Sequence, residues 1–131
     1  MEKVINVGGK EVRMRASALI PRLYRYQFKR DMIKDMNRLR INYNRCLEAK
    51  ENATEEEKNE AMLDAIDLEI FENVAWLFMK NAGEDVGNTP DEWLDSFDGI
   101  FDVYEIMPDV LELWGEDQIQ TSSLKKARGL R

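Results

Sequence analysis

The chain has 131 residues, a formal net charge of −7, one cysteine and no histidine. This length is typical of a single domain, and it is enough to bury a core without disulfides or a structural metal. The missing histidine and the lone Cys46 exclude a structural zinc site and a nucleophile activated by histidine, and with no signal-peptide pattern they indicate a reducing cytoplasm.

Residues 1–16 have the pattern of a β-hairpin. The first arm is rich in β-branched residues, and Gly8 and Gly9 supply the positive φ that a tight primed turn requires. In the second arm Val12 and Met14 alternate with arginines, as in a strand with one buried face. A hairpin alone is marginally stable, so we expect this one to pack against the rest of the domain.

A long helix is predicted from Ser17 to about residue 47. Ser17 is the expected N-cap, and Pro21 is tolerated because it falls within the first turn. Apolar residues then recur every three or four positions, which places them on one face of a helix. They are Ile20, Tyr24, Phe28, Met32, Met36, Leu39, Tyr43 and Leu47.

A second long helix is predicted from Glu55 to Asn81. Thr54 and Glu57 have the spacing of a capping box, and Gly83 is well placed to end the helix. The last part is more apolar than one buried face requires. One group shares a face and is expected in the core, namely Ile66, Ile70, Val74 and Leu77, while Phe71 and Phe78 form a second row. A surplus either packs in the core or contacts another protein: Leu68, Trp76 and Met79.

A third helix is predicted to begin with Thr89 at the N-cap, Pro90 at the first helical position and Glu92 at the third. Gly99 falls inside it, and its expected buried residues are Trp93, Phe97, Ile100, Phe101 and Tyr104. Pro108 then starts a short fourth helix that ends at Gly115.

The sequence therefore predicts a mainly α domain at 1–117, with a hairpin at 1–16, three to four helices at 17–115 and a mobile tail at 118–131. Charge is distributed unevenly. Residues 1–50 contain 13 Lys and Arg against 5 Asp and Glu, whereas residues 51–120 contain 2 against 21. Such asymmetry indicates two halves that pack against each other, within one chain or between copies of a homo-oligomer, or two surfaces for different partners.

The sequence has no motif for catalysis, cofactor binding or metal binding. A row of carboxylates between 95 and 112 fails the calcium-loop pattern, because Phe97 occupies the third position, where an oxygen ligand is required. Acyl, phosphoryl and hydride transfer each lack their usual motif. No apolar run is long enough to span a membrane. We therefore expect a protein that is not an enzyme, has no cofactor, metal or membrane partner, and acts through its surfaces.

Four segments in order resemble the tail assembly chaperones of long, non-contractile-tailed bacteriophages and prophages of Gram-positive bacteria. They are INVGGKEVRMRASALIPRLYRYQFKRDMIKDM at 5–36, FENVAWLFMKNAG at 71–83, TPDEWLDSF at 89–97 and YEIMPDVLELW at 104–114. The resemblance covers most of residues 3–115, and it is carried by the ordered set of segments rather than by a single signature.

The resemblance implies a helical protein that acts in the host bacterial cytoplasm and is absent from the mature virion. Family members are thought to coat the tape measure protein, keep it soluble and bring tail tube subunits to it, and many have a longer form made by a programmed ribosomal frameshift. An amphipathic helix docked in an apolar groove would suit this role. The candidate partner-binding residues are Tyr24, Phe28, Trp76, Phe78, Trp93 and Trp114.

Two other functions remain open. One is a nucleic-acid-binding or regulatory phage protein that uses the basic side chains of the first predicted helix, Arg22, Arg25, Lys29, Lys34 and Arg38. The acidic net charge disfavours binding to phosphates, so we expect no nucleic-acid partner. The other is a structural tail component that stays in the virion.

Overall fold

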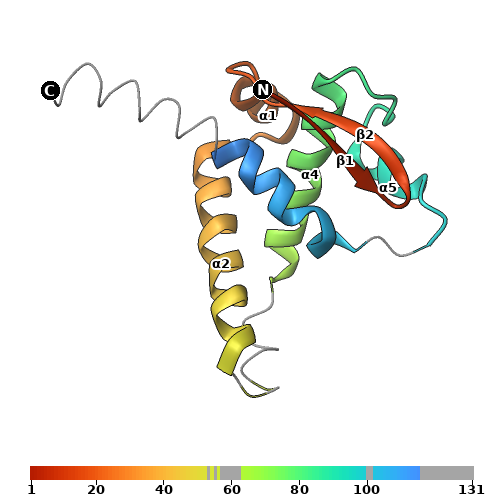
Figure 1. Ribbon diagram of the computed structural model, residues 1–131. Coiled ribbons are helices and arrows are strands. Elements are labelled where there is room, and N and C mark those ends of the chain that lie inside the picture. Colours follow the sequence, from red (N-terminus) through yellow and green to blue (C-terminus); the bar gives the residue numbers. More distant parts are fainter. Residues whose placement is uncertain (53, 55, 57–62, 100–101, 116–131) are drawn as a thin grey trace, which may run out of the picture.

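The computed structural model describes residues 1–52, 54, 56, 63–99 and 102–115. Its elements are β1 (Glu2–Val7), β2 (Lys10–Arg15), α1 (Ile20–Phe28), α2 (Met32–Asn52), α4 (Ala65–Asn81) and α5 (Pro90–Asp95), and residues 103–115 form a further helical segment. Figure 1 shows α2 and α4 side by side, with the hairpin beside the upper half of α4. The prediction of a mainly α fold with an N-terminal hairpin is confirmed.

The hairpin is a two-stranded antiparallel sheet closed by the pair Val7 and Lys10. Gly8 and Gly9 have φ of 60° and 84°, the positive values that a two-residue primed turn requires, so this prediction is confirmed. Side chains alternate between the two faces, and the inner face packs on α4. That buried face consists of Ile5, Val7, Val12 and Met14.

The predicted long first helix is interrupted at Lys29, so the expectation of one continuous helix is wrong. α1 ends at Phe28, and Lys29 takes the left-handed conformation at φ 58° and ψ 37°. Its N–H donates to the carbonyl of Arg25 at 2.9 Å, which satisfies one of the last carbonyls of α1. α2 begins anew because the side chain of Asp31 accepts from the N–H of Ile33 at 2.9 Å.

The start of α1 also differs from the prediction. Leu19, not Ser17, is the N-cap, and its side chain offers no capping hydrogen bond. Ser17 instead lies with its hydroxyl 3.5 Å from the side-chain amide of Asn81, at the end of α4. Pro21 is in the first turn, as expected, where its missing N–H costs no helical hydrogen bond.

Replacing Lys29 with glycine is expected to raise the free energy of unfolding by about 0.5–1 kcal/mol, because glycine adopts positive φ without the steric cost of a side chain. Urea denaturation followed by circular dichroism measures the change. Arg45→Gly, in the exposed interior of α2, is the matched control and is expected to lower stability by about 1 kcal/mol. Destabilisation by both variants would contradict the conformation of Lys29.

The second predicted helix is not continuous, so the expectation of one helix from Glu55 to Asn81 is wrong. Glu56 is helical, but Leu63 and Asp64 are not, and α4 begins at Ala65. Glu55, the predicted start, lies outside the described residues. Asp64 forms the capping box, since its carboxylate accepts from the N–H of Asp67 and the Asp67 carboxylate accepts from the N–H of Asp64. Glu57, of the predicted capping box, lies outside the described residues.

The end of α4 agrees with the prediction. Gly83 has φ 89° and its N–H donates to the carbonyl of Lys80 at 3.0 Å. The next N–H, of Glu84, reaches back to the carbonyl of Met79 at 3.1 Å. These two bonds and the left-handed glycine end the helix.

The third predicted helix is divided in two. Thr89 caps α5 by accepting from the N–H of Glu92 at 3.2 Å, as expected, but α5 ends at Asp95. A separate helical segment begins at 103, five residues before the predicted start at Pro108. The carboxylate of Asp102 accepts a hydrogen bond from the N–H of Tyr104, in the first turn of this segment. Ile100, Phe101 and the predicted tail at 118–131 lie outside the described residues.

The core consists of side chains from the hairpin, α1, α2, α4, α5 and the segment 103–115, together with residues of the connections between them. Its largest fully buried members include Trp76, Tyr24, Phe71, Phe78, Met14, Met36 and Met107. Three of the four core residues predicted in α4 are buried, but Ile66 is 49% exposed. It is wrongly predicted because it lies in the first turn of α4, at the rim of an open hollow of about 160 Å³ beside Arg38.

Ion pairs join the basic N-terminal half to the acidic half that follows. Each pair links residues far apart in the chain, so the charge asymmetry of the sequence is used within the fold. The pairs are Lys3 with Asp109 and Glu112, Arg13 with Glu84, and Arg38 with Asp64 and Asp67.

Candidate interaction surface

The six predicted partner-binding residues lie mainly in the core. Phe28 is half-buried, and the other five are buried: Tyr24, Trp76, Phe78, Trp93 and Trp114. The structure brings three of them together, since the ring of Phe28 lies 5.0 Å from that of Tyr24 and 6.1 Å from that of Trp76. Trp76 and Met79, two of the surplus residues of α4, are therefore core residues. In this conformation most of the six aromatic side chains pack beneath the surface and are not accessible to a partner.

A polar network around the buried carboxylate of Asp35 holds the corner between α1 and α2. The Tyr24 hydroxyl donates to a carboxylate oxygen of Asp35 at 2.7 Å, and the Arg30 guanidinium donates to both carboxylate oxygens at 2.7 and 2.9 Å. Tyr24 belongs to α1, Asp35 to α2, and Arg30 lies between them. The network thus connects both helices across the left-handed residue at 29.

The network changes the protonation behaviour of its members. Burial alone would raise the pKa of Asp35, but hydrogen bonds from Arg30 and Tyr24 and the positive charge of Arg30 outweigh it, so the net effect lowers this pKa. Burial, followed by the hydrogen bond to the Asp35 carboxylate, raises the pKa of Tyr24. Asp35 is therefore ionised and Tyr24 neutral at neutral pH, as an ion pair with Arg30 requires.

One face of α2 has an uncharged strip on its solvent side. Ile33 and Ile41 are 53% and 54% exposed, and the exposed side chains of Asn37 and Asn44 share their face at helical spacing. We call these four residues the outer strip; it extends about 16 Å along the helix axis. In a chain of which 34% is charged, a continuous uncharged strip with two exposed isoleucines is a candidate contact for an apolar partner.

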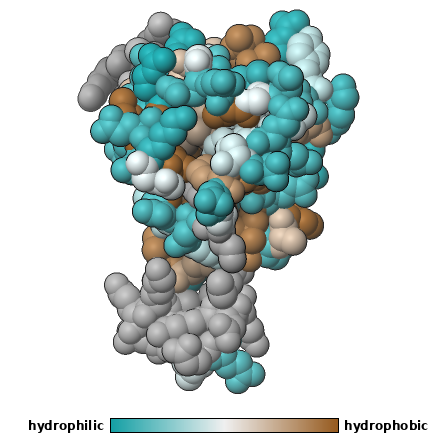
Figure 2. Space-filling model, turned by 90° about the vertical axis from the view of Figure 1, so that its right-hand side faces the viewer, coloured by the Kyte–Doolittle hydropathy of each residue, from teal (hydrophilic) through white to brown (hydrophobic). Residues whose placement is uncertain are grey.

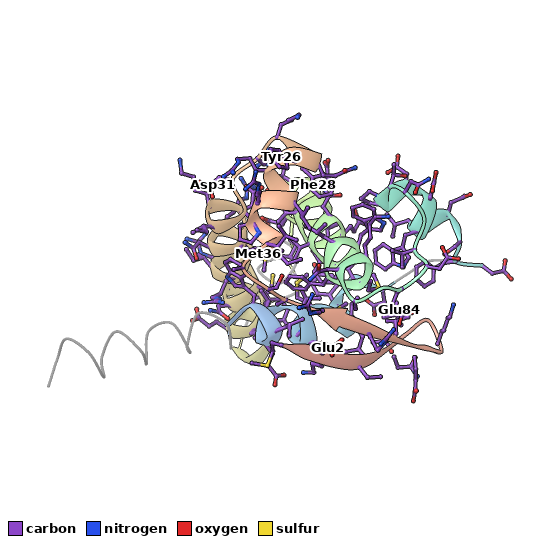
Figure 3. All side chains as sticks on the ribbon, turned by 90° about the horizontal axis from the view of Figure 1, so that it is seen from above. Glu2, Tyr26, Phe28, Asp31, Met36 and Glu84 are labelled. Carbon is purple, nitrogen blue, oxygen red and sulfur yellow. The ribbon has the colours of Figure 1, made fainter. Side chains whose placement is uncertain are left out.

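A second surface lies on α1 and combines apolar and basic side chains. Tyr26 is 55% exposed, and the guanidinium carbons of Arg22 and Arg25 lie 5.3 and 6.0 Å from the centre of its ring. Arg22 also donates to the Tyr26 hydroxyl at 2.9 Å. We call Leu19, Arg22, Arg25, Tyr26 and Lys29 the basic corner. In Figure 3 Tyr26 lies at the outer edge of the molecule, while Met36 lies between α2 and α4.

The basic side chains predicted for nucleic-acid binding do not form one free row. Arg38 donates to Asp67 and Asp64, both at 2.9 Å. Asp67 is buried and also accepts from the side-chain amide of Asn42 at 2.9 Å. Arg38 is thus part of the contact between α2 and α4, which the spacing of charges in the sequence did not show.

The described residues hold no cluster of three or more acidic or cysteine side chains placed to bind a metal ion. In the same residues, no helix is long and apolar enough to cross a membrane. Comparison with protein-family models, with curated proteins and with solved structures gives no match for this chain.

The outer strip was not among the predicted site residues. Ile33 and Ile41 lie eight positions apart, a helical spacing that could have indicated them once the buried stripe of α2 was assigned. The predicted partner-binding residues are all aromatic, and most of them lie in the core, because large rings contribute strongly to both cores and interfaces.

Proposed function

We propose that this chain is a tail assembly chaperone of a long, non-contractile-tailed phage or prophage. In the host cytoplasm it binds the tape measure protein, keeps it soluble, recruits tail tube subunits and leaves before the virion is complete. The proposal rests on the resemblance of four ordered segments between residues 5 and 114. A longer frameshifted form belongs to the same proposal.

The outer strip is the observation that best supports a binding role. A tape measure protein exposes long apolar helical surface until tube subunits enclose it. An amphipathic helix docks its apolar side against exposed aliphatic side chains, and amides beside them can pair with its polar edge. Ile33, Asn37, Ile41 and Asn44 provide both kinds of contact on one rigid helix.

Co-expression of the chain with the tape measure protein of the same phage tests the proposal. We expect the chain to keep the tape measure protein in the soluble fraction and to co-purify with it. The double variant Ile33→Asp/Ile41→Asp is expected to weaken this complex by about a hundredfold, because each buried isoleucine at an interface centre contributes more than 1 kcal/mol and a charge in its place is desolvated.

Ile66→Asp is the matched control, since Ile66 is exposed to a similar degree but lies on α4. We expect it to leave the complex unchanged. If the tape measure protein stays insoluble and no complex forms, the proposed function fails. If the complex forms equally well with both variants, the function stands and its assignment to the outer strip fails.

The alternatives have separate readouts. A gel shift at low salt that weakens steeply as salt is added would support a nucleic-acid-binding protein, because phosphate contacts release counterions. Detection of the chain by mass spectrometry in purified particles would support a structural tail component instead.

A further inference from the structure

An open hollow of about 400 Å³ lies at the corner between α1 and α2. Its apolar lining comes from Pro21, in the first turn of α1, and from Met32 and Ile33 at the start of α2. Ile33 is also the first residue of the outer strip, so the hollow continues the strip at the end nearest the corner. We call it the corner hollow. Ligand sites typically measure about 300–1,000 Å³, so it has room for a large apolar side chain.

The rest of the lining is charged, with an excess of positive charge. Arg25 and Lys29, from the basic corner, are exposed and form no ion pair within the described part of the chain. Arg30 also lines the corner hollow, but its guanidinium is paired with Asp35 at 2.7 Å. Asp31 contributes a carboxylate, which caps α2. An apolar side chain with acidic groups beside it therefore complements this end of the outer strip.

The opposite end of the outer strip is electrically balanced. Beyond Asn44, the charged side chains that the structure describes on α2 are Arg45 and Glu48, both exposed and of opposite sign. The positive end of the strip is thus the corner, where the N-terminus of α2 adds its partial positive charge. Because a helix has a partial negative charge at its C-terminus, a helix on the strip is favoured with its C-terminal end at the corner.

The corner and the hairpin lie on different sides of the molecule. In Figure 3 Tyr26 and Asp31 lie at one edge, and Glu2 and Glu84 lie toward the opposite one, beside the hairpin. Figure 2 views the molecule from the side of the hairpin tip, where hydrophobic residues lie among mostly hydrophilic ones. A helix that covers the outer strip and the corner hollow therefore leaves the hairpin uncovered.

We propose that the outer strip and the corner hollow together bind one amphipathic helix that runs antiparallel to α2. A large apolar side chain near the C-terminal end of this helix enters the corner hollow, and carboxylates within one turn of it pair with Arg25 and Lys29. Aliphatic side chains earlier in the helix cover Ile33 and Ile41. The inference rests on the proposed function, under which the helix belongs to the tape measure protein, and it adds the direction and the sequence requirements of that helix.

Peptides of about 25 residues that tile the tape measure protein of the same phage are the probes. A helix of this length extends about 38 Å, more than the strip requires. Fluorescence anisotropy with the full chain measures each dissociation constant. We expect the peptides that bind to contain a large apolar residue with a carboxylate three or four positions away. Replacing this apolar residue with alanine is expected to weaken binding about tenfold or more, as for other buried anchors.

Charge reversal identifies the positive end of the site. Arg25→Glu/Lys29→Glu is expected to weaken binding of these peptides about tenfold or more, and lysines in place of the peptide carboxylates are expected to restore it. Lys10→Glu/Arg15→Glu is the matched control, because it changes the charge equally at exposed residues of the hairpin. We expect it to bind like the wild type. Circular dichroism checks that each variant folds.

A nitroxide label at one end of a bound peptide reports its direction in NMR spectra of the chain. A label at the peptide C-terminus is expected to broaden the amide signals of Arg25 and Lys29, and a label at the N-terminus those of Asn44 and Arg45. The reverse assignment would overturn the antiparallel arrangement.

The outcomes separate this inference from the proposed function. If the chain keeps the tape measure protein soluble and co-purifies with it, but no peptide binds or Arg25→Glu/Lys29→Glu binds like the wild type, the inference is overturned and the function stands. If no complex with the tape measure protein forms and no peptide binds, both fail.

Discussion

Replacing Trp76 with alanine is expected to lower the free energy of unfolding by about 3–5 kcal/mol, the usual cost of removing a large buried ring. The side chain is 1% exposed, and its ring lies 6.1 Å from that of Phe28. Its Nε1–H donates to the carbonyl of Val86 at 3.2 Å, which ties the loop after α4 to the helix. Domains of this kind are stable by about 5–15 kcal/mol, so the variant would lose a large part of its stability.

Urea denaturation followed by circular dichroism measures this effect without relying on tryptophan fluorescence. Trp76→Phe keeps most of the ring but leaves the Val86 carbonyl unpaired, and we expect a cost of about 1–3 kcal/mol. Trp114→Phe is the matched control. Its Nε1 has no hydrogen-bond partner among the described residues, so this change is expected to cost less than Trp76→Phe. Equal costs would show that the bond to Val86 contributes little.

Asp35→Ala is expected to destabilise the fold by about 1–3 kcal/mol, because it leaves a buried hydrogen-bond donor without its acceptor, whereas the half-exposed Arg30 can be solvated. The Tyr24 hydroxyl, buried at the corner, would lose its acceptor, and Arg30 would lose both of its hydrogen bonds to the carboxylate. The left-handed turn between α1 and α2 would then lack its main polar connection.

The pH dependence of the free energy of unfolding, compared between the wild type and Asp35→Asn, gives an independent test. The folded state lowers the pKa of Asp35 below its ordinary value of 3.8, so the ionised carboxylate stabilises the fold above pH 4 and this stability is lost as the pH falls through the lowered pKa. We therefore expect the difference in stability between the wild type and Asp35→Asn to shrink between about pH 5 and pH 2. A difference that stays constant over this range would contradict the network.

Asp31→Ala is a control on the same segment. Asp31 is exposed and caps α2, so its loss is expected to cost only about 1 kcal/mol. A double-mutant cycle of Tyr24→Phe with Asp35→Asn then isolates the coupling between the hydroxyl and the carboxylate.

Sequence patterns predicted the elements better than their interruptions. The hairpin turn at Gly8 and Gly9, the end of α4 at Gly83 and the cap of α5 at Thr89 were predicted because each depends on a local backbone requirement. The break at Lys29 was not predicted, because the apolar stripe continues through it. Lysine also rarely adopts the left-handed conformation, so its presence does not indicate a break. Tertiary contacts of Tyr24 and Asp35 impose this turn.

The candidate surface was less predictable than the fold. Periodicity identifies apolar residues that share a face, but it does not show which faces other elements cover. Trp76, for which the sequence left open the core or a partner, is covered by Phe28 and the loop at Val86. Ile66, which was predicted to be buried, lies at the open end of α4. The exposure of a side chain on α4 depends on where α1 and the hairpin pack, and a local sequence pattern does not contain this information.

The hairpin also has a consequence for synthesis on the ribosome. It leaves the ribosome before its partners, because β2 packs on α4 and Lys3 binds Asp109 and Glu112, which are synthesised later. During translation the inner face of the hairpin, with Val12 and Met14, therefore lacks its cover until nearly the whole domain has emerged. The contacts of the hairpin with α4 and with the segment 103–115 therefore form only after both of these segments have emerged.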